Sequence, residues 1–236
     1  MPYRKEELIN GEIYHVILRG IEDSLIFKDD NDYYRGIFSI YEFNNTTPVE
    51  IWLRRQQRKK EKVLGGPSSQ ELQRDLLVGV LSFCFMPNHM HLLLRQKSDN
   101  GILKFMRKVG TGYAGYFNRK YQRKGYVFQN RFKSVHIKNN DQLMIVFNYI
   151  NANPISLIEP NFKEIGIKNP NKAMEFVENY KWSSFKDYLG IKNFPSITER
   201  EFVNQVIGGS KECQTMLKDW IMFKNDLSKF SEIFLD

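Results

Sequence analysis

The chain has 236 residues, enough to bury a hydrophobic core, and its length lies between the usual sizes of one domain and two. With 42% hydrophobic and 26% charged residues it has a globular composition, and it contains neither an apolar run of membrane-spanning length nor a signal-peptide core. We therefore expect a cytoplasmic protein without a membrane segment. The net charge of +8 favours a polyanionic partner, although charge alone does not separate DNA from RNA or from a membrane surface.

The first elements are a strand and a helix. Residues 12–20 alternate apolar and polar side chains and predict a strand. Acidic residues at 29–32 predict the start of a helix that continues to about residue 43. Residues 44–76 differ in character, because a segment with six basic residues and one acidic residue is followed by Gly-Gly-Pro-Ser-Ser. We interpret 44–76 as a partly mobile insertion whose charges are solvated, with a second nucleic-acid contact as the alternative.

Residues 76–95 predict two strands joined by a turn at Pro87-Asn88. Cys84 lies in the first of these apolar strands and fits a buried free thiol of a reducing compartment; two cysteines are too few for a zinc site made of cysteines. Side chains alternate along the second strand, so His89 and His91 share one face. Two such imidazoles can bind one metal ion, but taken alone the pair fits a structural role as well.

The rest of the chain, from about residue 101, predicts three helices, one strand and a helical tail. Residues 101–122 predict a helix, 125–137 a strand and 142–153 a helix that is capped by Asn140 or Asp141 and ends at Pro154. A shorter helix is predicted over 173–190, and a helical tail with a Gly-Gly break from about residue 196. The order predicts an α+β protein of the ferredoxin-like sandwich type, an antiparallel sheet with helices on it. We assign residues 1–190 to this domain and 191–236 to a C-terminal helical appendage.

A basic stretch runs through this second half. Between Lys104 and Lys138 there are ten Lys or Arg residues and no Asp or Glu, and aromatic residues are interleaved with them. Basic side chains neutralise phosphates and aromatic rings stack on unpaired bases, which favours nucleic-acid binding over a solvated face on an aromatic core. The candidate DNA-binding residues are Arg107, Lys108, Arg119, Lys120, Arg123, Lys124, Arg131 and Lys133.

Tyr149 and Asn153 are four residues apart on a predicted helix and so project from one face. A tyrosine can attack phosphorus when a metal ion neutralises the phosphate, and the Asn153 amide oxygen could join the two histidines as a ligand. The same spacing also fits an amphipathic helix with Tyr149 packed in the core.

Four motifs in order resemble the single-tyrosine HUH transposases, whose name denotes a His-hydrophobe-His motif. They are FCFMPNHMHLLLR, GYAGYFNRKYQRKGYVFQNRFKS, NYINANPI and YKWSSFKDYLG, and the N-terminal YHVILRGI also matches. The resemblance covers roughly residues 11–190 and is closest to the REP-associated tyrosine transposases of the insertion-sequence-200-like group. Two departures are Asn151, where this branch commonly has His, and the longer 44–76 segment.

The resemblance implies residue roles and an activity. His89 and His91, with Asn153, would bind Mg²⁺ or Mn²⁺; Tyr149 would be the nucleophile; Arg131 and Lys133 would contact DNA. The implied enzyme cleaves and rejoins hairpin-bearing, palindromic single-stranded DNA through a 5′-phosphotyrosine, as a monomer or a homodimer. There are three alternatives: a replication-initiator-like nickase, a domesticated protein that binds DNA hairpins without cutting, and an RNA-binding protein. Initiators usually carry a helicase-type module, and no Gly-X-X-X-X-Gly-Lys motif occurs in this sequence.

Overall fold

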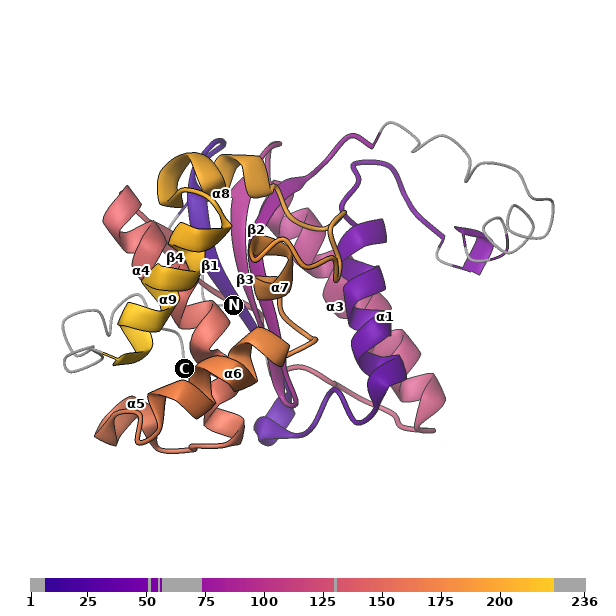
Figure 1. The fold of residues 1–236 in the computed structure, drawn as a ribbon. Helices are drawn as coiled ribbons and strands as arrows, with labels where there is room; N and C mark the ends of the chain where they lie inside the picture. The colour runs from indigo at the N-terminus through magenta and orange to yellow at the C-terminus, as the bar shows by residue number, and fades with distance from the viewer. Residues whose placement is uncertain (1–6, 51, 55, 57–73, 130, 223–236) are drawn as a thin grey trace, which may run out of the picture.

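The computed structural model describes residues 7–50, 52–54, 56, 74–129 and 131–222. The core elements follow the order strand–helix–strand–strand–helix–strand–helix (Figure 1). They are β1 (Ile13–Arg19), α1 (Asp30–Glu42), β2 (Val78–Met86), β3 (His89–Gln96), α3 (Gly101–Lys120), β4 (Lys133–Ile137) and α4 (Asn140–Ala152). The C-terminal helices are α5 (Phe162–Ile165), α6 (Pro170–Asn179), α7 (Phe185–Tyr188), α8 (Arg200–Ile207) and α9 (Ser210–Met222), and short 3₁₀ helices are η1 (Ile21–Asp23) and η2 (Asn153–Leu157).

The four strands form one antiparallel sheet in the order β2-β3-β1-β4. This order and the helices between the strands give the predicted ferredoxin-like α+β fold. Because β1 and β3 are central neighbours, residues far apart in sequence meet across them: Arg19 pairs with His89, and Ile17 with His91. The sheet thus brings the N-terminal strand against the predicted histidine pair.

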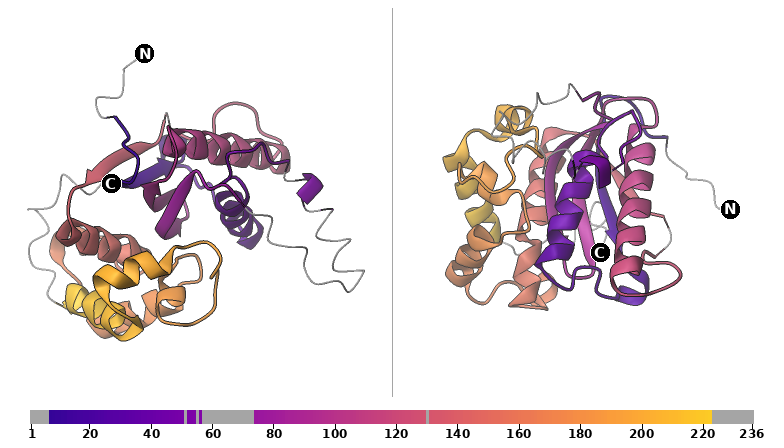
Figure 2. Two further views of the ribbon diagram at one scale, coloured as in Figure 1. Left: turned by 90° about the horizontal axis from the view of Figure 1, so that it is seen from above. Right: turned by 90° about the vertical axis from the view of Figure 1, so that its right-hand side faces the viewer.

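Helices cover both faces of the sheet (Figure 2). On one face α1 and α3 pack on inward side chains that include Val16 and Leu92, both fully buried. On the other face α4 and the C-terminal helices pack on Leu93 and Ile137. The alternation of each strand therefore separates two cores, and the histidines belong to the face covered by α4.

Local sequence explains where the helices begin. The Asp29 side chain accepts a hydrogen bond from the backbone N–H of Asp32 and caps α1, as predicted. For α4 the predicted cap is wrong by one residue: Asn139, and not Asn140 or Asp141, accepts from the N–H of Gln142 at 2.9 Å. Asn139 has extended backbone angles, which leave its side chain free to turn back onto the first helical turn.

Two further elements differ from the prediction. The strand predicted over 125–137 is regular only in β4, because the register shifts between the Ile17–Lys133 pair and the isolated Gly20–Phe128 bridge. The helix predicted over 173–190 is divided into α6 and α7. Residues between these helices pair instead with the edge of β2, where the Phe85 N–H donates to the Trp182 carbonyl at 2.9 Å.

The ends of the 44–76 segment meet at the core. The Asn44 side chain exchanges hydrogen bonds with both backbone groups of Val78, and the Thr46 N–H donates to the Asp75 carbonyl at 2.8 Å. The prediction of mobility concerns mainly residues 57–73, which lie outside the described residues. In the C-terminal region Gly208 separates α8 from α9, as the Gly-Gly break predicts, and α9 packs on α4 and α6.

Across the ranges that the structure describes, no helix combines the length and apolarity needed to cross a membrane.

Candidate active site

The two motif histidines converge at the start of β3. His91 is fully buried and His89 is 8% exposed, and their Nε2 atoms lie 2.9 Å apart. Two ligands on adjacent corners of an octahedral ion with bonds of about 2.0–2.1 Å would be separated by about 2.9 Å. The spacing of the two Nε2 atoms therefore fits a shared divalent ion.

The other nitrogen of each ring has its own partner. His89 Nδ1 lies 2.6 Å from Asn88 Oδ1, in the turn before β3, and His91 Nδ1 lies 3.0 Å from Nε2 of His15 on β1. An amide oxygen only accepts hydrogen bonds, so it holds the His89 proton on Nδ1 and leaves Nε2 with a free electron pair. Such outer contacts are what orients imidazoles as metal ligands.

Electrostatics keep both imidazoles neutral. Burial lowers the pKa of His91 well below its ordinary value, and the nearby charges of Lys163 and Arg19 lower it further. Burial also lowers the pKa of His89 well below its ordinary value, with His91 as the next cause. Neutral imidazole is the form that binds metal ions. At neutral pH these side chains are thus ready to ligate without losing a proton.

Tyr149 approaches the histidines from α4. Its ring centroid lies 5.7 Å from that of His91 and 5.9 Å from that of His15, edge to face in both cases. The side chain is 2% exposed, and burial raises the pKa of its phenol, opposed by a hydrogen bond with Asn153 and by the charge of Arg19. The structure therefore brings the predicted nucleophile to the predicted metal ligands, in surroundings where a phenolate needs positive charge nearby.

Asn153 and Lys163 lie beside Tyr149. The Asn153 side-chain nitrogen donates to the Tyr149 carbonyl at 3.1 Å. Lys163, on α5, places its Nζ 3.2 Å from the Tyr149 hydroxyl oxygen and 3.5 Å from Asn153 Oδ1. The Asn153 oxygen thus faces the same cation as the Tyr149 oxygen. Asn151, at the position where the related branch commonly has His, is buried and donates to the Phe147 carbonyl and to Ser82, which is a packing role.

Among the described residues, no group of three or more His, Cys, Asp or Glu side chains is arranged to hold a metal ion. A metal site built on His89 and His91 therefore needs an amide or solvent oxygen as a further ligand. In the sequence-based prediction that ligand is the Asn153 side-chain oxygen. The two neutral, converging Nε2 atoms of His89 and His91 are the part of the predicted ligand set whose geometry fits a divalent ion.

The predicted DNA-binding residues fall on two sides of the sheet. Arg107, Lys108, Arg119 and Lys120 lie on α3, which covers the face opposite the histidines. Lys133 pairs with Ile17 in the sheet and so shares the face of His91. The structure brings Lys133 toward the catalytic candidates and leaves the α3 residues on a separate surface.

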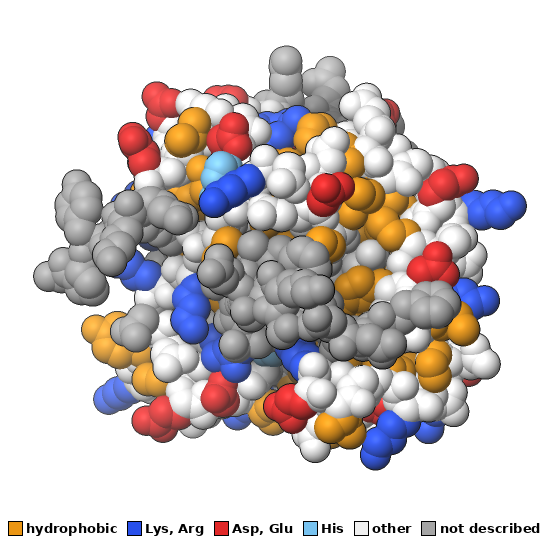
Figure 3. Space-filling view, turned by 90° about the vertical axis from the view of Figure 1, so that its left-hand side faces the viewer, with side chains coloured by type: hydrophobic (Ala, Val, Ile, Leu, Met, Phe, Trp, Pro, Cys, Tyr) orange, Lys and Arg blue, Asp and Glu red, His pale blue; other side chains and the backbone are white. Residues whose placement is uncertain are grey.

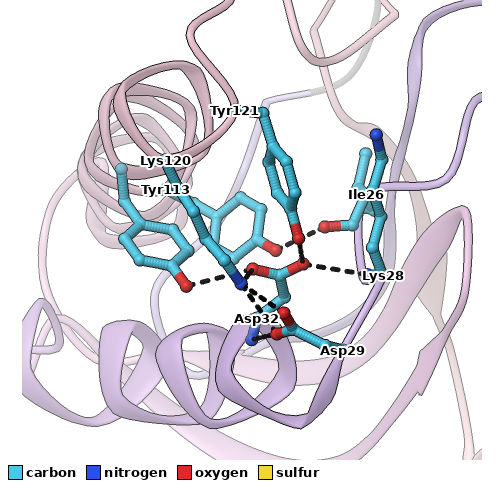
Figure 4. A network of polar contacts seen from close by, with 8 residues as sticks. Ile26, Lys28, Asp29, Asp32, Tyr113, Lys120 and Tyr121 are labelled. Atoms are coloured by element: carbon cyan, nitrogen blue, oxygen red, sulfur yellow. Dashed lines mark hydrogen bonds and ion pairs between the residues drawn. The ribbon is translucent and has the colours of Figure 1, made fainter.

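Two of these lysines hold the fold together. Lys108 donates to the carbonyl oxygens of Asn45 and Thr47, at 2.5 and 2.9 Å, where the chain leaves α1. Lys120 contacts both Asp29 and Asp32 at 2.7 Å (Figure 4). Asp32 is fully buried and also accepts from the hydroxyls of Tyr116 and Tyr121. Arg107, Arg119, Lys124, Arg131 and Lys133 are exposed, and Arg123 is partly so.

On the side of the molecule that carries α4, α5 and α9, Lys and Arg side chains are interspersed with acidic and apolar ones (Figure 3). The cations near the catalytic candidates include Arg19, Lys133 and Lys163.

Sequence reasoning missed three members of this site: His15, Arg19 and Lys163. His15 and Arg19 share a face of β1 by alternation, and the pairing of β1 with β3 that is typical of this fold could have placed them opposite the histidines. Lys163 gave no such signal, because it lies on a four-residue helix after an irregular segment.

Comparison with known proteins finds a family match over the part of the chain that holds most of the candidate site. Residues 56–153, which contain both motif histidines, Tyr149 and Asn153, match the family described as "Transposase IS200 like". The match supports a DNA transposase and agrees with the resemblance to the insertion-sequence-200-like group that the sequence motifs indicate. A solved structure described as "Structure of the REP associates tyrosine transposase bound to a REP hairpin" is similar over 82% of this chain and 90% of that chain, with 15% identity and a TM-score of 0.46. No curated protein matches the chain.

Proposed function

We propose that this protein is a metal-dependent transposase that cleaves and rejoins hairpin-bearing single-stranded DNA, with Tyr149 as the nucleophile. The observation that carries the proposal is the meeting of Tyr149, on α4, with the converging Nε2 atoms of His89 and His91, on β3. A purely structural histidine pair would not require a tyrosine, an amide and a lysine around the same point.

The ion would be Mg²⁺ or Mn²⁺, held by His89 Nε2, His91 Nε2 and Asn153 Oδ1. When bound, it would neutralise charge on a non-bridging oxygen of the scissile phosphate. Imidazole ligands favour the softer Mn²⁺, whereas the amide oxygen suits either ion. The contacts of His15 and Asn88 keep the two rings oriented toward this position.

The Tyr149 oxygen attacks phosphorus in line, and an oxygen–phosphorus bond forms as the bond from phosphorus to the 3′-oxygen breaks. The electron pair goes to the 3′-oxygen, which takes up a proton and leaves as a 3′-OH, while the phenol proton is released to solvent. The product is a 5′-phosphotyrosine. Because this linkage conserves the bond, a 3′-OH from another DNA end can reverse the step and join two strands without a nucleotide cofactor.

The test is cleavage of a labelled hairpin-bearing single strand in Mn²⁺, with the covalent protein–DNA adduct measured on denaturing gels. Tyr149→Phe should form no adduct and cut no DNA, yet bind the hairpin with nearly unchanged affinity. Tyr126→Phe, which removes a hydroxyl from an 84%-exposed tyrosine, is the matched control and should cut normally. Undiminished nicking by Tyr149→Phe would overturn the proposal. Hairpin binding without cutting by the unaltered protein would support the non-catalytic alternative instead.

A further inference from the structure

Lys163 reaches the reacting oxygen from outside the motifs that define the family resemblance. After α4 ends, η2 turns the chain and α5 brings it back toward the last turn of α4. Phe162, which is 1% exposed, fixes α5 in a core cluster together with Ile155 of η2. The neighbouring residue, Lys163, is thereby directed toward Tyr149.

The contact is specific to the hydroxyl end of the tyrosine. Lys163 Nζ lies 3.2 Å from Tyr149 Oη but 5.1 Å from the centre of the ring, so the ammonium group faces the oxygen more closely than the ring face. The same Nζ lies 3.5 Å from Asn153 Oδ1. A lysine ammonium has three donors and no acceptor, so it can only donate to both oxygens.

Burial makes such a donor necessary at this position. Tyr149 is 2% exposed, and removing a phenolate from water without compensation is costly. In cleavage the phenol oxygen must carry negative charge as it attacks, and in rejoining it must carry the same charge as it leaves. A fixed cation beside the oxygen stabilises that charge in both directions, more strongly in a water-poor site than in bulk solvent.

We propose that Lys163 is a catalytic residue, whose ammonium group donates a hydrogen bond to Tyr149 Oη and stabilises its negative charge as nucleophile and as leaving group. This inference rests on the proposed function and adds a residue to it. In cleavage the phenol proton goes to solvent, the Oη–phosphorus bond forms and the phosphorus–O3′ bond breaks. In rejoining these bonds reverse, and Lys163 stays protonated throughout.

The first test compares Lys163→Met with Lys163→Arg in single-turnover cleavage and rejoining of a hairpin-bearing oligonucleotide in Mn²⁺. Lys163→Met should slow both directions on the order of 100-fold, the usual loss when one charge-stabilising donor is removed from an active site. Lys163→Arg keeps a charged donor and should recover most of the rate. Lys168→Met, which removes an exposed lysine five residues away, is the control and should leave the rates unchanged.

A second measurement separates this role from positioning. Tyr149 is replaced by a fluorinated tyrosine, whose more acidic phenol forms the anion more easily. If Lys163 stabilises that anion, the loss caused by Lys163→Met should shrink about tenfold with the fluorinated residue, following the dependence of rate on nucleophile acidity. A lysine that merely supports the fold would give the same loss with either tyrosine.

The outcomes are distinct. Wild-type rates for Lys163→Met, a loss confined to DNA affinity, or an unchanged loss with the fluorinated tyrosine would each overturn the role of Lys163. None of these results affects the nucleophile, which fails only if Tyr149→Phe still cuts DNA. Thermal unfolding of each variant, with a midpoint matching the unaltered protein, shows that the rates compare folded molecules.

Discussion

His15 Nε2 lies 3.0 Å from His91 Nδ1, and this contact links two strands at the point where the proposed metal ligands converge. Two arrangements of protons satisfy it. When His15 donates to His91, the outer Nε2 of His91 carries a proton and can donate to His89; when His91 donates to His15, that Nε2 has a free electron pair. Only the second arrangement leaves His91 Nε2 able to bind an ion. Which nitrogen of His91 carries the proton therefore depends on His15, which is not itself a proposed ligand.

The first prediction concerns His15 and metal affinity. His15→Leu removes the acceptor and should weaken Mn²⁺ binding by about 10–100-fold, the usual effect of deleting an outer partner of a ligating histidine. His15→Gln retains an acceptor oxygen and should bind within severalfold of the unaltered protein. Isothermal titration calorimetry measures the affinities, and nitrogen NMR of the histidine rings should show the His91 proton on Nδ1 once Mg²⁺ is bound. Equal affinities for the two variants would contradict the role of His15.

The second prediction concerns stability and pH in the presence of a chelator. His89 and His91 have pKa values held well below the ordinary 6.5, mainly by burial, so the folded chain keeps them neutral where the unfolded chain takes up protons. The contribution of these histidines to the free energy of unfolding is fully present above about pH 6.5. Below that pH the free energy of unfolding should fall by up to about 1.4 kcal/mol per pH unit for each histidine. Urea unfolding at pH 7.5, 6.5 and 5.5 measures this slope. The double variant His89→Asn/His91→Asn should have a flatter profile over this range, and an equal slope would contradict the assignment.

The fold and half of the site follow from local sequence patterns. Alternation along β3 places His89 and His91 on one face, and helical spacing places Tyr149 and Asn153 together, because both patterns depend only on neighbours in the chain. His15 requires the register between β1 and β3, which is a long-range property. Lys163 depends on how η2 and α5 turn back on α4, and no periodicity encodes that return.

Lys120 shows where the local sequence pattern predicts wrongly. The sequence between Lys104 and Lys138 contains no acidic residue, which predicts a surface free to bind phosphate. In the structure Asp29, the cap of α1, and the buried Asp32 come from another helix and neutralise Lys120. A charge pattern along one segment therefore cannot show which cations are paired across the fold.

The third prediction concerns the buried carboxylate of Asp32. It accepts from Tyr116, Tyr121, Lys120 and the Lys28 N–H, so Asp32→Asn removes its charge and at least one acceptor. We expect a loss of about 2–4 kcal/mol in the free energy of unfolding, measured in urea. Asp29→Asn is the matched control, because Asn also caps helices and the Asp29 side chain is 47% exposed; it should cost less than about 1 kcal/mol. Comparable losses for both variants would show that Asp32 is not the centre of this network.

The fourth prediction separates two adjacent cations at the end of α3. Arg119 is exposed, whereas Lys120 is paired with Asp29 and Asp32. If α3 contributes to DNA binding, Arg119→Ala should weaken hairpin binding and reduce the slope of log affinity against log salt by about 1, because one fewer phosphate contact is made. Lys120→Ala should instead lower the unfolding free energy and leave the salt slope unchanged, because its charge is already neutralised within the protein. Fluorescence anisotropy across a salt series, combined with urea unfolding, measures both quantities. A reduced salt slope for Lys120→Ala at unchanged stability would show that the ion pair opens when DNA binds.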